Sequence, residues 1–170
     1  MTMNSKLTNE FVLDKIKAEF DEAILSETPS DMLTLEVEPS KVHALIKWLK
    51  EEPTLQINFL TLLGGIHYPN NLGKELGVNY HLHSLVNNFR IRLKTFVSIE
   101  NPTIDSIVDL YVGANWQERE TFDFYGIIFD GHPNLTRILN EDTMDYFPLR
   151  KEYHLEDPTR EDKDDRFFGR

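Results

Sequence analysis

The chain has 170 residues, which is about the length of one globular domain. Its 29 acidic residues against 18 basic ones give a net charge of −11, which argues against a nucleic-acid partner and against docking on anionic lipid through a polybasic patch. The absence of cysteine excludes a disulfide, a cysteine nucleophile, a thiolate-bound iron–sulfur cluster and a cysteine-type zinc site.

The sequence shows no pattern typical of targeting or membrane insertion. A basic region followed by an apolar run is missing at the start, and Glu10, Asp14 and Glu19 do not fit a transit peptide. No apolar run approaches the roughly 20 residues needed to span a bilayer. We therefore expect the chain to stay in the compartment where it is made, a bacterial cytoplasm, and to reach a membrane only through partners.

Two helices and a strand are predicted in the first third of the chain. Apolar spacings of three and four predict a helix from residue 8 to about 22, which ends at the turn residues 28–31. Alternation over 33–38 predicts a half-buried strand. Pro39 opens a second helix, which Pro53 closes. Its apolar stripe consists of Val42, Leu45, Ile46 and Leu49.

A block of strands follows. The nearly all-apolar run 55–63 predicts a strand that is buried on both faces and ends at the glycines 64–65. Alternation over 78–85 and 89–97 predicts two more strands, joined by a tight turn at 87–88 because Asn tolerates the left-handed conformation. One face of the second strand is cationic and carries Arg90, Arg92 and Lys94.

The remaining chain predicts a third helix and then an irregular limb. Asn101-Pro102-Thr103 is expected to cap a helix whose buried face is Ile104, Ile107, Val108 and Tyr111. The last twenty residues are dense in charge without apolar periodicity, so a neighbour is expected to hold them in an extended form. We predict an α/β (α+β) fold, with helices on a mixed, mostly antiparallel sheet over 1–140 and a long irregular C-terminal limb over 141–170.

The segment 115–139 concentrates charge and aromatic residues. Asn115 and Glu118 have the spacing of a capping box, which would satisfy backbone donors at a helix start. Arg119 and Asp123 lie four apart and are predicted to pair on one helix face. Gly126 suits a left-handed position that ends the helix.

The rest of this segment predicts a turn and a short apolar patch. Asp130 and Gly131 favour a turn, and Pro133 forces an extended conformation on His132. The apolar residues over 135–139 predict a second short helix. Taken alone, the pattern favours a structural unit: a capped aromatic helix, a turn and a short helix.

These residues resemble the signature of the C-subunit of respiratory complex I, the small cluster-free component of the proton-pumping NADH:quinone oxidoreductase. The resemblance covers about Trp116 to Tyr153, and 148–153 is similar to the family's Pro-Leu-Arg-Lys-Asp-Tyr-Pro element. Thr136 and His154 depart from the family pattern, as does the stretch 145–147. The matching residues are Glu118, Arg119, Glu120, Asp123, Tyr125, Gly126, His132, Pro133, Arg137, Arg150 and Lys151.

The resemblance implies a role without redox chemistry in this chain. Members of the family carry no cofactor, and FMN and the iron–sulfur clusters lie in partner subunits. They sit in the hydrophilic arm against the subunit that lines the quinone cavity, on the cytoplasmic side of the bacterial inner membrane. The resemblance then implies ion pairs and hydrogen bonds within the subunit and across its interface for Glu118, Arg119, Glu120, Asp123, His132 and Arg137. It implies no catalytic, cofactor or metal residue.

Three other interpretations stay open. The chain could be the equivalent subunit of a membrane-bound hydrogenase, a formate hydrogenlyase or a ferredoxin-type complex, because another subunit binds the electron donor. It could be a carboxylate hydrolase that uses Glu118 with Glu120 or Asp123, although residues 118 and 120 would point about 200° apart on a helix. A metal site is the third, and its candidate ligands are His67, His81, His83 and His132.

Overall fold

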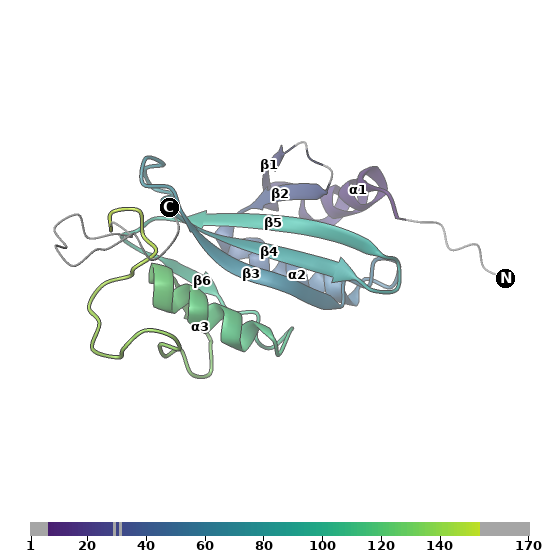
Figure 1. Ribbon diagram of the computed structural model, residues 1–170. Coiled ribbons are helices and arrows are strands. Elements are labelled where there is room, and N and C mark those ends of the chain that lie inside the picture. Colours follow the sequence, from purple (N-terminus) through teal and green to yellow (C-terminus); the bar gives the residue numbers. More distant parts are fainter. Residues whose placement is uncertain (1–6, 29, 31, 154–170) are drawn as a thin grey trace, which may run out of the picture.

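The structure, a computed structural model, describes residues 7–28, 30 and 32–153. It contains a five-stranded sheet in the order β1-β2-β5-β4-β3 and a two-stranded sheet of β6 and β7. In Figure 1, α1 and α2 lie behind the larger sheet and α3 runs below β3. In chain order the elements are α1 (Asn9–Phe20), η1 (Asp21–Ala23), β1 (Ile24–Thr28), β2 (Leu33–Val37), η2 (Pro39–Lys41), α2 (Val42–Glu51), β3 (Phe59–His67), β4 (Leu76–Ser84), β5 (Phe89–Val97), β6 (Thr103–Asp105), α3 (Ala114–Tyr125) and β7 (Ile128–Asp130).

The predicted fold class is confirmed. In the larger sheet, β2 and β5 run parallel while the other neighbouring strands run antiparallel, so the sheet is mixed and mostly antiparallel. The parallel strands β6 and β7 are joined through α3 and form a small β-α-β unit. Helices therefore pack on a mixed sheet, as the apolar patterns predicted.

The first two helices and the central hairpin are where they were predicted. The Thr8 side chain accepts a hydrogen bond from the Phe11 N–H (3.2 Å) and caps α1. A 3-10 turn at Pro39 leads into α2. Strands β4 and β5 pair over nine residues each, and Asn88 (φ 48°) takes the left-handed conformation in the turn between them.

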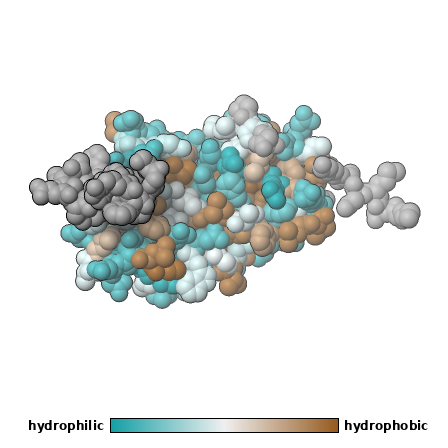
Figure 2. Space-filling model, viewed as in Figure 1, coloured by the Kyte–Doolittle hydropathy of each residue, from teal (hydrophilic) through white to brown (hydrophobic). Residues whose placement is uncertain are grey.

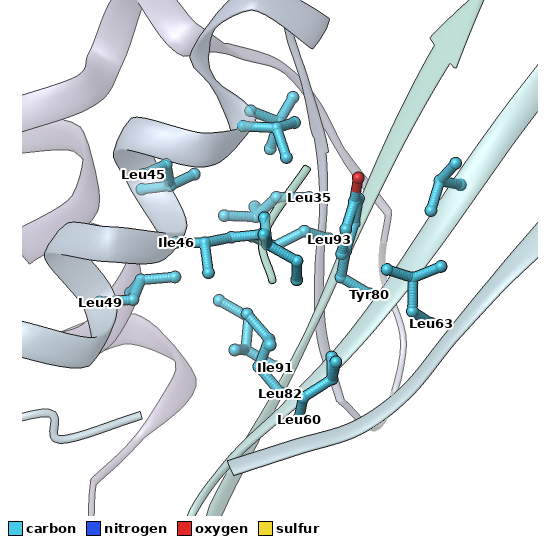
Figure 3. Close-up of a cluster of buried hydrophobic side chains, with 14 of the residues drawn as sticks. Leu35, Leu45, Ile46, Leu49, Leu60, Leu63, Tyr80, Leu82, Ile91 and Leu93 are labelled. Carbon is cyan, nitrogen blue, oxygen red and sulfur yellow. The ribbon is translucent and has the colours of Figure 1, made fainter. Parts of the chain in front are cut away.

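The core lies between α2 and the sheet. Figure 3 shows Leu45, Ile46 and Leu49 of α2 facing Leu82 and Ile91 of the sheet, and each of these side chains is at most 1% exposed. Burying a Leu or Ile side chain contributes about 1.5–3 kcal/mol. Packing of this stripe therefore holds α2 in place.

Two predictions for the first strands were wrong. The stretch 24–28, which lay between the helix predicted to about 22 and the turn predicted at 28–31 and was not predicted as a strand, forms the edge strand β1, because its backbone pairs with β2. The strand predicted at 55–63 is β3 (Phe59–His67), which continues through both glycines. It is not buried on both faces, since Phe59 and Leu62 are 45% and 49% exposed.

The third predicted helix is absent from the described structure at 101–112, where β6 and turns stand instead. The Pro102 carbonyl accepts from the Ile128 N–H (2.7 Å) and the Ser106 N–H donates to the Asp130 carbonyl (2.8 Å). Pairing with β7 thus uses the backbone groups that a helix would need. Three of the four residues predicted for its buried face are nevertheless in the core: Ile104, Ile107 and Tyr111.

Beyond β7 the described chain is irregular, and bends and chain without regular structure stand where a short helix was predicted at 135–139. The described part of the predicted limb, 141–153, turns back onto α3. The Leu149 N–H donates to the Phe124 carbonyl at 3.2 Å. The boundary predicted at 140 stays a prediction, and 154–170 lie outside the described residues.

Candidate functional site

The predicted signature residues gather around α3. We call residues 132–150, which follow β7 and pass along α3 in Figure 1, the collar. The other side of α3 packs on β3, where a Cβ on Gly65 would overlap the Tyr125 ring. The helix therefore lies between the sheet and the collar.

Asp123 is the main link between α3 and the collar. Its carboxylate is fully buried and accepts a hydrogen bond from Arg137 Nη1 at 2.7 Å. It also accepts from the backbone N–H groups of Ile138 (3.1 Å), Leu139 (2.8 Å) and Asn140 (3.0 Å), and from the Asn140 side chain (3.0 Å). Burial alone would raise the pKa of Asp123, but these donors outweigh it and hold the pKa well below its usual range. The carboxylate therefore stays ionised.

The predicted pair between Arg119 and Asp123 was wrong. Arg119 instead donates to the Thr136 carbonyl (3.0 Å), the Thr136 hydroxyl (3.1 Å) and the Arg137 carbonyl (3.0 Å). Its guanidinium carbon lies 5.2 Å from the ring centroid of Trp116. Although Arg119 and Asp123 are four residues apart on the helix, they do not pair. Asp123 points into the packed interior, where Arg137 and the collar backbone reach it.

Two further arginines fasten the collar. Arg137 Nη2 donates to the carbonyls of Met144 (2.7 Å) and Tyr146 (3.2 Å), and Arg150 Nε donates to the Tyr125 carbonyl (2.8 Å). The guanidinium carbons of both lie near the ring centroid of Phe147, at 5.2 Å for Arg137 and 4.6 Å for Arg150. Phe147 is thus held by two cation–π contacts, which are worth about 0.5–2 kcal/mol each.

Glu118 fastens the other side of α3. The predicted capping box was wrong, because Glu118 is fully buried and accepts from the Ser106 hydroxyl (2.7 Å) and the Ile107 N–H (2.8 Å). It therefore joins α3 to the turn after β6. Burial raises the pKa of Glu118 to about 7, although these two donors act in the opposite direction.

We expect Glu118→Gln to flatten the pH dependence of stability. Between the ordinary value of 4.5 and about 7, the folded chain binds more protons at this position than the unfolded chain. The free energy of unfolding therefore falls as pH rises through this window, by about 2–3 kcal/mol. Urea unfolding from pH 4.5 to 8 should show a smaller loss for Glu118→Gln, whereas Glu120→Gln, on the exposed side of α3, should keep the original slope. Equal slopes for all three proteins would contradict this prediction.

The remaining signature residues shape the ends of α3. Gly126 ends the helix in the predicted left-handed conformation (φ 74°), and its N–H donates to the Phe122 carbonyl at 2.8 Å. His132 Nδ1 accepts from the Asn134 N–H (3.0 Å), which leaves Nε2 to donate to the Asn115 carbonyl (3.2 Å). Pro133 stands exposed in the turn beside it.

The last two signature residues, Lys151 and Glu120, do not join α3 to the collar. The Lys151 N–H donates to His67 Nδ1 at 2.9 Å, which ties the chain after the collar to the end of β3. The Lys151 ammonium lies 5.3 Å from the ring centroid of Tyr68, at the margin of an open depression of about 500 Å³. Glu120 is exposed on α3.

The sequence did not indicate several partners of the signature residues, among them the side chains of Ser106, Asn140 and Phe147. Each comes from irregular chain and meets its partner only through the fold. Phe147 also lies in the stretch where the sequence departs from the family pattern, so no local signal marked it.

The geometry offers little for the hydrolase and metal interpretations. The carboxylates of Glu118 and Asp123 accept hydrogen bonds from two different segments, the turn after β6 and the collar, and Glu120 faces solvent. His81, one of the candidate metal ligands, accepts a hydrogen bond at Nε2 from Arg92 Nε at 3.2 Å. Across the described ranges, no group of three or more His, Cys, Asp or Glu side chains is placed to hold a metal ion.

No helix within the described residues has the length and apolar character that crossing a membrane requires.

Comparison with known proteins gives consistent matches. The family model for "Respiratory-chain NADH dehydrogenase, 30 Kd subunit" matches residues 35–159. The C-subunit of NADH-quinone oxidoreductase from Mycolicibacterium gilvum (strain PYR-GCK) is 43% identical over 74% of this chain and 55% of that protein. The C-subunit from Roseiflexus sp. (strain RS-1) is 42% identical over 88% of this chain and 86% of that protein. The chain spans about half the length of several relatives, including 49% of the C-subunit from Streptomyces coelicolor (strain ATCC BAA-471 / A3(2) / M145).

Solved structures share the fold as well. The trypsin-resistant fragment (1-134) of Nqo5 matches with a TM-score of 0.63 and 27% identity, over 74% of this chain and 98% of the fragment. A chain of the membrane-bound sulfane sulfur reductase, an archaeal respiratory membrane complex, matches with a TM-score of 0.69 and 20% identity, over 86% of this chain and 85% of that chain. At that identity the second match shows the fold alone.

Proposed function

Because the chain belongs to the family of the respiratory-chain NADH dehydrogenase 30 Kd subunit, we propose that it is a structural subunit of a proton-translocating NADH:quinone oxidoreductase. In this role it carries no redox group, and FMN and the iron–sulfur clusters belong to other subunits. It docks the subunit that lines the quinone cavity, in the peripheral arm on the cytoplasmic side of the membrane. Electrons then pass from NADH to quinone through its partners.

The observation that carries the proposal is how the signature side chains are used. The side chains of Asp123, Arg119 and Arg137 form hydrogen bonds that hold the collar against α3. Glu118 does the same toward the turn after β6. Such bonds fix a surface in place, and a fixed surface lowers the entropic cost of binding a partner.

That surface carries large apolar side chains that a partner could bury. Trp116, in contact with Arg119, is 60% exposed, and Leu139 is 65% exposed. Aromatic side chains and arginine are enriched at the centres of protein interfaces. Other exposed apolar residues of α3, β7 and the collar are Ile128, Tyr146 and Leu149.

The test compares assembly with folding. We expect the variant Trp116→Ala/Leu139→Ala to fold, with a melting temperature lower by no more than a few degrees because the contact with Arg119 is lost, but to co-purify with the complex at least several-fold less than the original chain. Leu72→Ala, at an 88% exposed position in the loop between β3 and β4, is the matched control and should assemble normally. The original chain should bring down the quinone-cavity and cluster-bearing subunits from its native membranes. Recovery of that chain as a lone monomer, or normal assembly of the double variant, would contradict the proposal.

The same purification separates the related complexes. An equivalent subunit of a hydrogenase or ferredoxin-type complex would co-purify with a different electron-input subunit, which mass spectrometry identifies. The identities of 42–43% to subunits named for NADH-quinone oxidoreductase favour the NADH-type complex.

A further inference from the structure

One face of the five-stranded sheet is left open by the helices. Tyr80 and Leu82 of β4 point toward α2 in Figure 3, and Gly65, paired with Val78, contacts α3. Side chains alternate along a strand, so the residues between these point to the opposite face. We call the β3, β4 and β5 residues on that side the open face; they include Phe59, Leu62, His83, Arg90, Arg92 and Lys94.

The open face carries a row of positive charge in an acidic chain. Arg90, Arg92 and Lys94 follow one another along β5, and Arg90 lies opposite His83 of β4. The ion pairs recorded among the described residues use none of the three. Glu36 of β2, opposite Lys94, lies 2.6 Å from the Lys74 ammonium instead. The row is therefore not neutralised by these neighbours, although the whole chain has a net charge of −11.

An apolar margin lies beside this row. Phe59 and Leu62 of β3 are 45% and 49% exposed and point to the same side, since they pair with His83 and His81. Figure 2 shows hydrophilic and hydrophobic surface side by side on the side of the molecule turned toward the viewer in Figure 1. The open face thus combines a cationic row on β5 with an apolar row on β3.

The spacing of the two rows fits a helix. Neighbouring strands lie about 4.8 Å apart, so β3 and β5 are about 10 Å apart, which is the diameter of a helix with its side chains. The cations on β5 recur every two residues, or about 6.7 Å, while carboxylates four apart on a helix recur every 6 Å or so. A strand binding at the edge of β3 is disfavoured, because the Leu63 N–H there already donates to the Gln117 side chain.

We propose that the open face binds an acidic amphipathic helix of another subunit. Its carboxylates lie over Arg90, Arg92 and Lys94, and its apolar side covers Phe59 and Leu62. This surface is separate from the one formed by α3 and the collar, so the inference goes beyond the proposed function.

Cross-linking in the assembled complex tests the chemistry of the partner. A carbodiimide joins an amine directly to a carboxylate in contact with it. We expect Lys94 to be joined to an Asp or Glu in an acidic helical segment of another subunit. Lys94→Arg keeps the charge but removes the reactive amine, so it should abolish that cross-link. A cross-link to a second copy of this chain, or none from Lys94, would overturn the proposal.

Accessibility gives an independent readout, because the chain has no cysteine of its own. Leu62→Cys places a single thiol on the open face. A maleimide should label it at least tenfold more slowly in the detergent-solubilised complex than in the isolated chain. Equal rates would overturn the proposal, and so would protection seen only in intact membranes, since that result would place lipid there.

Charge reversal tests the cationic row. Arg90→Glu/Arg92→Glu should lower the amount of chain in the complex at least several-fold. The melting temperature of the isolated chain should fall by no more than a few degrees, since the only hydrogen bond found for these two side chains among the described residues is that of Arg92 to His81. Lys41→Glu/Lys47→Glu makes the same change in charge at exposed positions at and beyond the start of α2 and should assemble normally. If both variants assemble normally while Trp116→Ala/Leu139→Ala does not, the open-face proposal fails and the proposed function stands.

Discussion

Replacing Asp123 by alanine should lower the free energy of unfolding by about 3–5 kcal/mol, the range found when one partner of a buried ion pair is removed. The change leaves the Arg137 guanidinium, whose side chain is 10% exposed, without its carboxylate. It also leaves the N–H groups of Ile138, Leu139 and Asn140 without an acceptor. A domain is stable by only about 5–15 kcal/mol, so this variant should lie close to unfolding.

Urea denaturation of the isolated chain measures the effect. Asp123→Asn keeps one acceptor oxygen but removes the charge, and it should lose less than the alanine variant. Asp130→Ala removes an exposed carboxylate on β7 and should change stability by less than about 0.5 kcal/mol. Combining Asp123→Ala with Arg137→Ala should cost clearly less than the sum of the single changes, because the two side chains are in contact. A loss below about 1 kcal/mol for Asp123→Ala would mean that the collar does not depend on this carboxylate.

Gly126→Ala should be the next most damaging single change, at about 2–4 kcal/mol. A side chain at φ 74° costs about 1 kcal/mol in the left-handed region. The added Cβ would also lie 2.5 Å from the Phe147 ring and 2.7 Å from Arg150 Nη2, and such overpacking costs about 1–3 kcal/mol. The collar would have to move away from the end of α3.

Gly131 provides a matched control for this change. It has nearly the same backbone conformation (φ 80°), but a Cβ there would meet no atom within 4 Å among the described residues. Gly131→Ala should therefore show the conformational cost alone, about 1 kcal/mol, in the same urea measurement. Equal losses at the two glycines would show that Phe147 and Arg150 do not pack on Gly126 in solution.

The parts of the fold that were predicted correctly are those whose signal is local. The α2 stripe and the alternation of β4 and β5 each repeat over several residues, so the pattern marks the element by itself. The strands β1, β6 and β7 have three to five residues and owe their form to a partner strand. For β6 that partner lies beyond α3, and the apolar spacing of 104–111 resembled a helix because its side chains are buried whichever way the backbone runs.

In the candidate site, too, the features with a local sequence signal were predicted and the contacts between distant segments were not. The residues of the site were found by resemblance, and the left-handed Gly126 followed from helix geometry. Their partners were not found, because local spacing paired Asp123 with Arg119, four residues away, while the real partner Arg137 is fourteen residues away across irregular chain. Glu118 likewise fitted a local cap but bonds Ser106 and Ile107 in the turn after β6.

The contacts between α3 and the collar are made largely through the collar's main chain. From α3, Asp123 receives three consecutive backbone N–H groups of the collar, and Arg119 donates to two collar carbonyls. Within the collar, Arg137 donates to two more carbonyls. Main-chain atoms are the same whatever residue carries them. The course of the collar therefore depends mainly on the side chains of α3 and on Arg137, Phe147 and Arg150. Collar positions whose side chains make no contact with α3 can differ, and so suit different neighbours, without changing the path of the chain.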